Sequence, residues 1–285
     1  MPRLAALAIV LLTIACAGSA GRPAAAPPAP AGAAPTTPAA PATAVPHVFV
    51  IVMENRGYAE AMAQPYTAHL AAQYAVATNY HAVSHPSLPN YLALTAGSTF
   101  GITDDAYHRL GAGGIGEELT AHGVSWRAYM EGMTRGCLDS PAPYAVKHDP
   151  FAYFGGCPPN VVPLTALDGD LAGAATPSFV WITPDLCHDG HDCSSRQADD
   201  FLAGLVPKIL ASAAWRDGVL FVTWDEDDGG SGNRVPAIVV APDLATHSTN
   251  RPHDHYSLLA TVEDLLRVPR LGEAQRADPL SELLR

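Results

Sequence analysis

Short apolar runs with the composition of buried strands alternate along this chain with stretches of helical periodicity. Strands are predicted at residues 47–53, 76–80, 125–130, 178–183, 219–224 and 235–240. Helices are predicted at residues 66–75, 88–96, 116–122, 164–171, 196–214 and 258–266, with Pro207 able to kink the fifth of them. Parallel strands need long crossover connections, which helices of this kind supply. The alternation therefore predicts one α/β domain with a largely parallel sheet and helices on both faces.

The length and charge of the chain limit its fold and its partners. Its 285 residues suffice for one such domain with a full core. The net charge is −12 and the only lysines are Lys147 and Lys208, which argues against binding of nucleic acid or of an anionic membrane surface. A phosphate substrate is compatible with this charge, because a bound metal ion reverses the sign locally. No feature of the sequence indicates a protein partner.

The N-terminal segment has the pattern of an export signal. Arg3 precedes the apolar residues 4–12, a run too short to span a bilayer, so residues 1–20 are predicted to be a signal peptide. The small residues at 17–20 suit ordinary cleavage. The four residues that end at Cys16 instead resemble a bacterial lipoprotein signal, in which Cys16 becomes the lipidated first residue. Both processing routes stay open.

A linker follows this signal. Residues 21–46 are almost all Ala, Pro, Gly and Thr, a composition that cannot bury a core and that suits a semi-extended tether. We expect the folded domain to occupy residues 47–285. The mature protein is therefore expected to be secreted, or held at the cell surface by a lipid on Cys16.

The cysteine count agrees with export. Without Cys16, an even number of cysteines remains, which suits an oxidising compartment. Four cysteines allow three pairings. We favour the most local pairing, Cys137–Cys157 and Cys187–Cys193, because each pair brackets one loop-like stretch. A metal site built on cysteine is disfavoured, since no C-x-x-C pair occurs.

Polar side chains follow several predicted strands at the points where they end. They are Glu54, Asn55, Glu131, Asp185, His188, Asp189, His191, Asp192, Asp225 and Glu226. Ligands collect at the carboxyl ends of the strands in such sheets, so these side chains predict one cleft. Oxygen ligands suit Mg²⁺, Ca²⁺, Mn²⁺ or Zn²⁺. The alternative for the acidic run at 225–228 is a solvated turn.

Ser87 is the candidate nucleophile of this cleft. It directly precedes a predicted helix, with Pro86 before it and Pro89 in the first turn. A hydroxyl at a helix N-terminus faces a positive dipole and free N–H groups, which suit an alkoxide and a phosphate. The alternative is a serine that caps the helix and has no chemical role. The two interpretations are compatible with each other.

Four segments of the chain resemble a known family, in the family's order. They are Val50–Arg56, His85–Tyr91, Asp189–Asp192 and Thr223–Asp228. On these segments the chain resembles the bacterial phosphoesterase family that contains secreted acid phosphatases and phospholipases C. The resemblance extends from about His47 to about Leu266. It implies an alkaline-phosphatase-like α/β fold.

The resemblance also implies a set of site residues. A divalent metal ion, of a kind that the sequence does not identify, would be held by Glu54, Asn55, Ser87, Asp225 and Glu226. Ser87 would be the nucleophile. Bound metal would lower the pKa of the Ser87 hydroxyl.

Further residues would complete the implied site. His191 matches the family's site histidine and would protonate the leaving group or activate water, unless it only packs in its loop. Lys147 and His148 would neutralise phosphate oxygens, or belong to a solvated loop. Asn90 would donate to phosphate, or bond locally in its helix. His85 and His255 are expected to be structural.

The sequence thus predicts an exported, metal-dependent acid phosphatase that hydrolyses phosphate monoesters through a phosphoryl-enzyme intermediate on Ser87. One alternative is a phosphodiesterase of the phospholipase C type. The other is a non-catalytic metal-binding surface protein, in which the acidic loops are structural. The absence of an added C-terminal domain favours the phosphatase over the diesterase.

Overall fold

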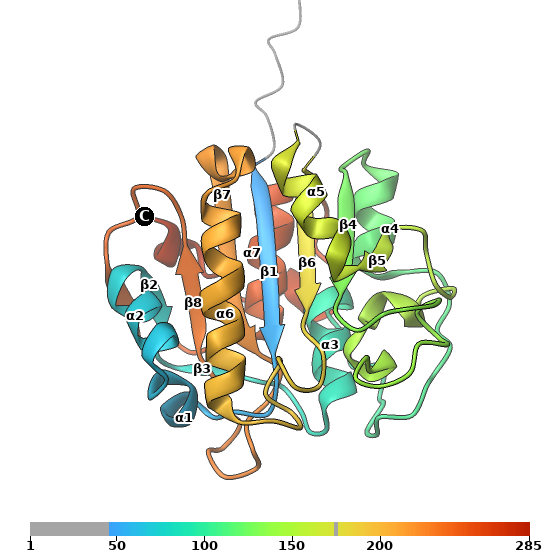
Figure 1. The fold of residues 1–285 in the computed structure, drawn as a ribbon, viewed down its shortest axis with the longest axis horizontal. Helices are drawn as coiled ribbons and strands as arrows, with labels where there is room; N and C mark the ends of the chain where they lie inside the picture. Colours follow the sequence, from blue (N-terminus) through green and yellow to red (C-terminus); the bar gives the residue numbers. More distant parts are fainter. Residues whose placement is uncertain (1–45, 174–175) are drawn as a thin grey trace, which may run out of the picture. The chain divides into compact units, whose positions relative to one another are not determined.

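A computed structural model describes residues 46–173 and 176–285 of the chain. Within them, eight strands form one sheet in the order β5-β4-β6-β1-β7-β8-β2-β9 (Figure 1). The strands are β1 (His47–Met53), β2 (Ala75–Ala77), β4 (Trp126–Met130), β5 (Val161–Pro163), β6 (Phe179–Thr183), β7 (Gly218–Trp224), β8 (Ala237–Val240) and β9 (His247–Thr249). Only β8 is antiparallel to its neighbours, β7 and β2. The predicted α/β fold with a largely parallel sheet is confirmed.

Helices cover both faces of this sheet. They are α1 (Tyr58–Met62), α2 (Pro65–Gln73), α3 (Ser87–Ala96), α4 (Gly114–Ala121), α5 (Leu167–Ala172), α6 (Ser195–Leu210) and α7 (His255–Leu266). On one face α6 packs against α2 and α5, and on the other α7 packs against α3 (Figure 1). The two layers bury the central strands on both sides, which explains their continuous apolar sequences.

The centre of the sheet brings two distant parts of the sequence into register. β1 lies between β6 and β7 and is parallel to both, with Met53 opposite Trp224. Residues 48–53 have no exposed surface. Since both strands end at the same level, Glu54 and Asp225 leave the sheet side by side. The amide of Asp225 donates to the carbonyl of Met53 over 2.9 Å.

The predicted strand at 76–80 is wrong in its extent. The chain forms β2 and then, after a bend, β3 (Tyr80–His81), which pairs with β10 (His253–Asp254) in a separate two-stranded sheet. The predicted helix at 196–214 is also too long. It ends at Leu210, three residues after Pro207, and a short 3₁₀ helix at Ala213–Asp217 follows.

The elements that the prediction missed are short. The α1 helix has five residues, and β5, β9 and β10 have three or fewer. Segments of this length are too short for a hydrophobic period to show, so they form only because tertiary contacts hold them.

Both predicted disulfides are confirmed. Cys137 is bonded to Cys157, and Cys187 to Cys193. Among the residues that the structure describes, no helix combines the length and the apolar character needed to cross a bilayer. The predicted signal peptide and Cys16 lie outside the described residues, as does nearly all of the linker at 21–46.

Candidate active site

The site begins where β1 and β7 end. Glu54 and Asp225 have no exposed surface, and Glu226 has 4%. The amide of Asn55 donates to Oδ1 of Asp225 over 3.2 Å, so the two strand ends are tied together. The structure therefore brings these four of the predicted metal ligands to one place.

Two oxygen atoms in this group lack a partner. Oδ1 of Asn55 and Oδ2 of Asp225 are buried, and neither has a hydrogen-bond partner among the described residues. Asn55 also has a positive φ of 48°, a left-handed conformation that Asn tolerates better than most residues. Unpaired buried polar atoms and such backbone conformations are both costly, and they concentrate at functional sites.

Ser87 is the first residue of α3 and faces these carboxylates. Its hydroxyl donates to Oε2 of Glu54 over 3.1 Å and lies 3.3 Å from Oε1 of Glu226. The residue at the cap position is Pro86, without a side-chain hydrogen bond to the helix. The alternative interpretation of Ser87 as a capping serine is therefore wrong. Its hydroxyl is turned toward the strand ends.

His148 lies behind Glu54 and is buried with it. Its Nε2 atom is 2.9 Å from Oε1 of Glu54, and its Nδ1 atom is 3.1 Å from Oδ2 of Asp189. Burial alone would lower the pKa of His148, but the charge of Glu54 and the contacts with both carboxylates raise it to about 9. Tyr91 stacks on the ring, with centroids 5.3 Å apart. His148 is thus a cation that compensates buried carboxylates.

The carboxylates differ in their protonation. Burial, together with the charges of Glu54 and Glu226, raises the pKa of Asp225 well above its usual range. Burial likewise raises the pKa of Glu226 to about 7, although His85 acts against it. Burial also acts to raise the pKa of Glu54, but contact with His148 outweighs it and the pKa is lowered. Full ionisation of the three carboxyl groups is therefore unfavourable without a further cation, and Asp225 and Glu226 favour their neutral forms.

His191 and Lys147 lie at the open edge of the site. Nζ of Lys147 is 3.1 Å from Nε2 of His191, and the His191 and His148 ring centroids are 5.6 Å apart. Nδ1 of His191 is 2.7 Å from Oδ1 of Asp192. Lys147 also contacts Asp105 over 3.0 Å. Asp105 has no motif around it, so nothing in the sequence marked it.

Asn90 does not face the site. Its Oδ1 atom accepts from the amides of Val83 and Ser84, and its Nδ2 atom donates to the carbonyls of Ser84 and Pro86. All its hydrogen-bonding groups are thus used to shape the loop before Ser87. The geometry does not support the expected contact with phosphate, and the local interpretation of Asn90 holds.

The acidic residues at 225–228 differ in how deeply they are buried. Asp227 is buried and accepts from the amides of Gly229, Ser231 and Asn233, so it builds its own loop. Asp228 is exposed. The interpretation of the whole run as a solvated turn is therefore wrong, because its first three residues are buried.

Two further histidines contact the acidic run. Nδ1 of His85 lies 2.6 Å from Oε2 of Glu226. His255 is buried, and burial lowers its pKa to about 4, so the ring is neutral. Its Nε2–H donates to the carbonyl of Asp225 over 2.6 Å, and its Nδ1 accepts from the hydroxyl of Tyr80. His255 thus supports a strand end, as expected of a structural histidine.

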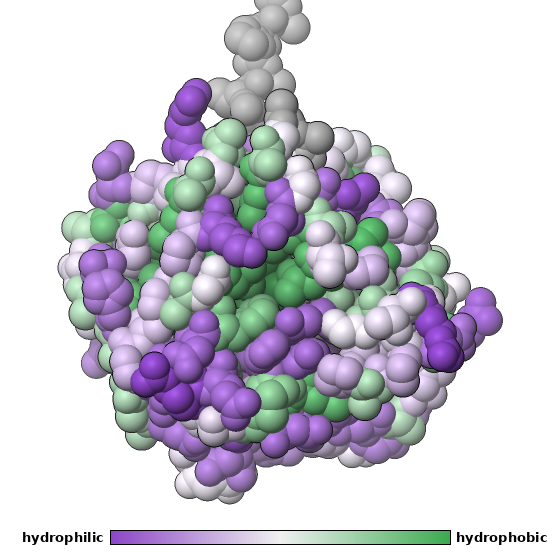
Figure 2. Space-filling view, viewed as in Figure 1, coloured by the Kyte–Doolittle hydropathy of each residue, from purple (hydrophilic) through white to green (hydrophobic). Residues whose placement is uncertain are grey.

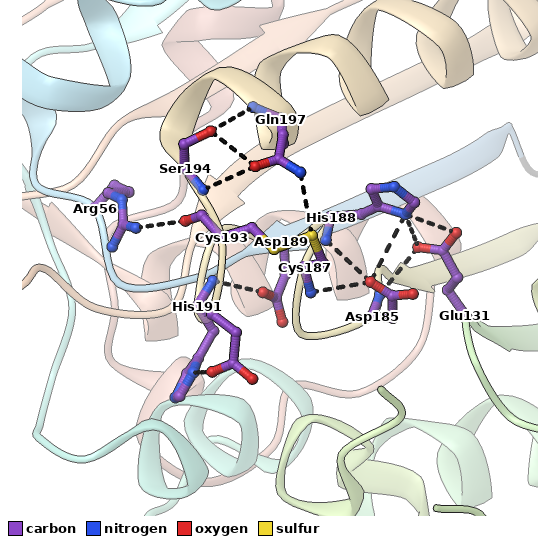
Figure 3. The surroundings of a disulfide bond; sticks show 11 residues. Arg56, Glu131, Asp185, Cys187, His188, Asp189, His191, Cys193, Ser194 and Gln197 are labelled. Atoms are coloured by element: carbon purple, nitrogen blue, oxygen red, sulfur yellow. Dashed lines mark hydrogen bonds and ion pairs between the residues drawn. A yellow bond between two sulfur atoms is a disulfide. The ribbon is translucent and has the colours of Figure 1, made fainter. Parts of the chain in front are cut away.

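The described residues contain two other sets of side chains with metal-ligand spacing. One is Glu54, His148 and His191, and the other is Glu131, Asp185 and His188. The first set is a poor cation site, because the two ring nitrogens of His148 already contact Glu54 and Asp189, and Nζ of Lys147 lies 3.1 Å from Nε2 of His191. The second set lies on the other side of the loop closed by Cys187 and Cys193, away from His191 (Figure 3).

A hollow on the face that carries α6 is separate from this site. A cavity of about 760 Å³ lies between α5 and α6, and Figure 2 shows its apolar floor. Its lining includes Met133, Leu164, Phe201 and Leu205. Glu131, one of the strand-end side chains expected in the cleft, lines it, but none of the predicted catalytic, substrate-binding or metal-binding residues does.

Comparison with known proteins shows the family of the chain. The sequence profile of the Phosphoesterase family matches residues 52–269. The chain is 32% identical over 245 residues to a phosphatidylinositol-3-phosphatase of Mycobacterium tuberculosis, covering 83% of this chain and 82% of the relative. It is 31% identical over 250 residues to a probable acid phosphatase of Kluyveromyces lactis, covering 79% of this chain and 59% of the fungal protein.

Solved structures share the fold at low identity. A putative sulfatase from Bacteroides thetaiotaomicron has a TM-score of 0.61 and 12% identity, covering 85% of this chain and 75% of that one. A protein of the alkaline phosphatase superfamily from Vibrio parahaemolyticus has a TM-score of 0.56 and 12% identity, covering 80% and 69%. These likenesses show the fold alone.

Proposed function

We propose that this chain, which belongs to the phosphoesterase family and is a phosphoric ester hydrolase, is an exported, metal-dependent acid phosphatase acting on phosphate monoesters. The observation that carries the proposal is the position of Ser87. Its hydroxyl faces Glu54 and Glu226, beside unpartnered oxygens of Asn55 and Asp225.

The donor set of these residues fits a divalent cation. Carboxylate, amide and hydroxyl oxygens are the ligands of hard cations, and here two of the oxygens have no other partner. A bound cation would also relieve the repulsion that raises the pKa values of Asp225 and Glu226. When bound, the metal would lower the pKa of the Ser87 hydroxyl and neutralise phosphate oxygens. Glu54, Asn55, Ser87, Asp225 and Glu226 are the proposed ligands.

Ser87 would attack first. Its oxygen forms a bond to phosphorus, the ester P–O bond breaks, and the Ser87 proton passes to a neighbouring carboxylate oxygen. The ester oxygen leaves with the P–O electron pair and takes a proton from solvent water at the open edge of the site. Lys147 would offset the charge of the phosphate oxygens during this step.

Hydrolysis of the phosphoserine would complete the cycle. The Lys147 ammonium can donate hydrogen bonds but cannot accept them. The Nε2 atom of His191 must therefore accept from it with a lone pair. That lone pair accepts from Lys147 in the structure, so His191 can take the proton of water only once the Lys147 N–H has turned away from Nε2. Water then bonds to phosphorus and gives its proton to Nε2, the bond from Ser87 to phosphorus breaks, Ser87 takes back the proton held by the carboxylate, and phosphate leaves. Of the two roles expected for His191, we therefore propose the activation of water.

The monoester is proposed over the diester because the sequence relatives described above are named phosphatases. Export is supported by the two disulfides, which persist in oxidising compartments. The proposed signal peptide at residues 1–20 and linker at 21–46 agree with it. The mass of the mature N-terminus decides between secretion and a lipid anchor on Cys16, because an N-terminus beyond Cys16 contradicts the anchor.

The proposal is tested by trapping the intermediate. Purified protein with defined divalent metals is given para-nitrophenyl phosphate and a diester analogue, then quenched in acid and mapped by mass spectrometry. We expect turnover of the monoester and phosphate on Ser87. Ser87→Ala should abolish both, whereas Ser98→Ala, at the other end of α3, should not. Turnover in Ser87→Ala would contradict the mechanism, and preference for the diester would contradict the substrate class.

A further inference from the structure

Asp105 connects two parts of the site that lie far apart in sequence. It belongs to the loop between α3 and α4. Its Oδ1 atom accepts from the amide of Leu88 over 3.0 Å, and its Oδ2 atom accepts from Nζ of Lys147 over 3.0 Å. Leu88 directly follows Ser87. One carboxylate thus joins the start of the nucleophile's helix to the lysine.

The hydrogen bonds of Lys147 leave one donor free. Its ammonium group has three N–H donors and no acceptor. One donates to Asp105 and a second to Nε2 of His191. Among the residues that the structure describes, the third has no partner. A phosphate oxygen at the site would therefore be able to accept from Lys147 without displacing either neighbour.

The same contacts fix the state of His191. Because Nε2 accepts from Lys147, the ring proton sits on Nδ1, which faces Oδ1 of Asp192 at 2.7 Å. We assign this tautomer from the contacts of the two nitrogens. Lys147 therefore acts on His191 as well as on the substrate.

The network lies at the partly exposed edge of the site. The side chains of Asp105, Lys147 and His191 are 31%, 20% and 29% exposed, whereas Glu54 and His148 are buried. A lysine has a long flexible stem, and holding its ammonium at one point requires a partner. Burial acts to lower the pKa of Lys147, but the hydrogen bond to Asp105 and nearby carboxylates raise it. The ammonium therefore stays charged.

We propose that Asp105 is a positioning residue for phosphoryl transfer, which holds the Lys147 ammonium between the start of α3 and His191. Asp105 itself does not touch the substrate. It acts through Lys147, which would contact the phosphate and keep a lone pair on Nε2 of His191. The inference rests on the proposed function, and it names a residue that none of the recognised motifs contains.

The first test is a double-mutant cycle on activity. Asp105→Asn keeps an acceptor for Leu88 but removes the charge that holds Lys147. We expect kcat/KM to fall roughly ten- to hundredfold, which is typical of lost positioning. Asp105→Glu, which keeps the carboxylate, should recover part of the loss. Asp104→Asn is the matched control, because Asp104 is adjacent but contacts only His108 and Ala106.

The cycle separates positioning from a local structural effect. If Asp105 acts through Lys147, then adding Asp105→Asn to Lys147→Met should cause almost no further fall in kcat/KM. Additive losses would overturn the proposal. So would wild-type activity in Asp105→Asn or in Lys147→Met.

The second test does not depend on activity. Lys147 and Lys208 are the only lysines, so their acylation by acetic anhydride can be compared in one sample by mass spectrometry. Lys208 is 55% exposed and pairs with Asp168, and it serves as the internal standard. Asp105→Asn should raise the acylation rate of Lys147 several-fold relative to Lys208, and Asp104→Asn should not. An unchanged rate in Asp105→Asn overturns the proposal.

The two tests distinguish failure of this inference from failure of the proposed function. If the wild type releases no phosphate with any metal, the proposed function fails, and the role in phosphoryl transfer fails with it. If the wild type is active but the acylation rate or the activity of Asp105→Asn is unchanged, only the inference about Asp105 fails.

Discussion

The Nε2 atom of His148 lies 2.9 Å from Oε1 of Glu54, and the two side chains are 2% and 0% exposed. A buried ion pair costs solvation free energy, which close contact offsets only while both partners are present. The pair therefore makes His148 necessary for the stability of the site, whatever its part in the chemistry.

Removal of the His148 charge should destabilise the protein. His148→Phe keeps a ring against Tyr91 but leaves Glu54 buried without its cation. We expect the free energy of unfolding to fall by about 3 kcal/mol, measured by urea denaturation of metal-free protein at pH 7. His122→Phe, at an exposed position after α4, should change it little. Equal midpoints for the His148 variant and wild type would contradict the compensating role.

Divalent cations should stabilise the protein through the strand-end carboxylates. The wild type should have a lower melting temperature in chelator than with a bound metal, because the buried groups Glu54, Asp225 and Glu226 then repel one another. One of Mg²⁺, Ca²⁺, Mn²⁺ or Zn²⁺ should raise the melting temperature by several degrees. Asp225→Asn keeps the acceptor for the Asn55 amide, so it should melt higher than wild type in chelator and respond weakly to the metal.

A matched variant separates this site from the second group of metal-ligand residues. Glu131→Gln alters the group formed by Glu131, Asp185 and His188, and it should respond to metal as the wild type does. If the response is lost in Glu131→Gln and kept in Asp225→Asn, the cation binds at the other group. A melting temperature that no metal changes would contradict a metal site altogether.

The Cys187–Cys193 disulfide should matter more for activity than for the fold. It closes the loop that carries His191, and Arg56 donates to the carbonyl of Cys193 over 3.0 Å (Figure 3). Replacing both cysteines with serine should cost about 2 kcal/mol of stability, since the loop is short. We also expect roughly tenfold lower kcat, because the position of His191 becomes less defined.

Ser194→Ala is the control for a loss of stability near the loop that leaves the disulfide intact. Ser194 caps α6 directly after the disulfide, and its removal should cost about 1 kcal/mol without opening the loop. This variant should keep wild-type kcat. Equal kcat values for wild type and for the variant with serine at both Cys187 and Cys193 would show that the disulfide does not position His191.

A buried carboxyl group far from the strand ends should make stability depend on pH. Burial raises the pKa of Glu263 from 4.5 to about 8, despite a hydrogen bond from the amide of Leu271 and the charge of Arg270. The fold favours the neutral form. Its contribution to stability is therefore fully present below pH 4.5, and it is lost as the pH rises through 8.

Glu263→Gln tests this pH dependence. Gln keeps the acceptor for Leu271 and cannot ionise. Relative to wild type, the variant should gain stability as the pH rises from 5 to 9, up to roughly 4 kcal/mol. Urea denaturation at several pH values measures the difference. A constant difference across this range would contradict a raised pKa for Glu263.

Much of the fold was predictable because its elements carry strong local signals. Apart from His47 and Thr223, the runs at 47–53 and 219–224 are apolar, as is typical of central parallel strands, and they form β1 and β7. The order of the strands was not predictable. Pairing of β1 with β7 depends on contacts between residues about 170 positions apart, which local periodicity does not encode.

The side chains that follow the strands, and the family that they resemble, could be predicted from the sequence alone. Glu54, Asn55, Ser87, Asp225 and Glu226 were identified in this way, and the structure brings them together. The contacts of each side chain could not be predicted. Asn90 forms all its hydrogen bonds within its own loop, and Asp105 is recognised only by its contacts with Leu88 and Lys147. A residue type limits the bonds that a side chain can form, whereas the packing of distant segments selects the bonds that it does form.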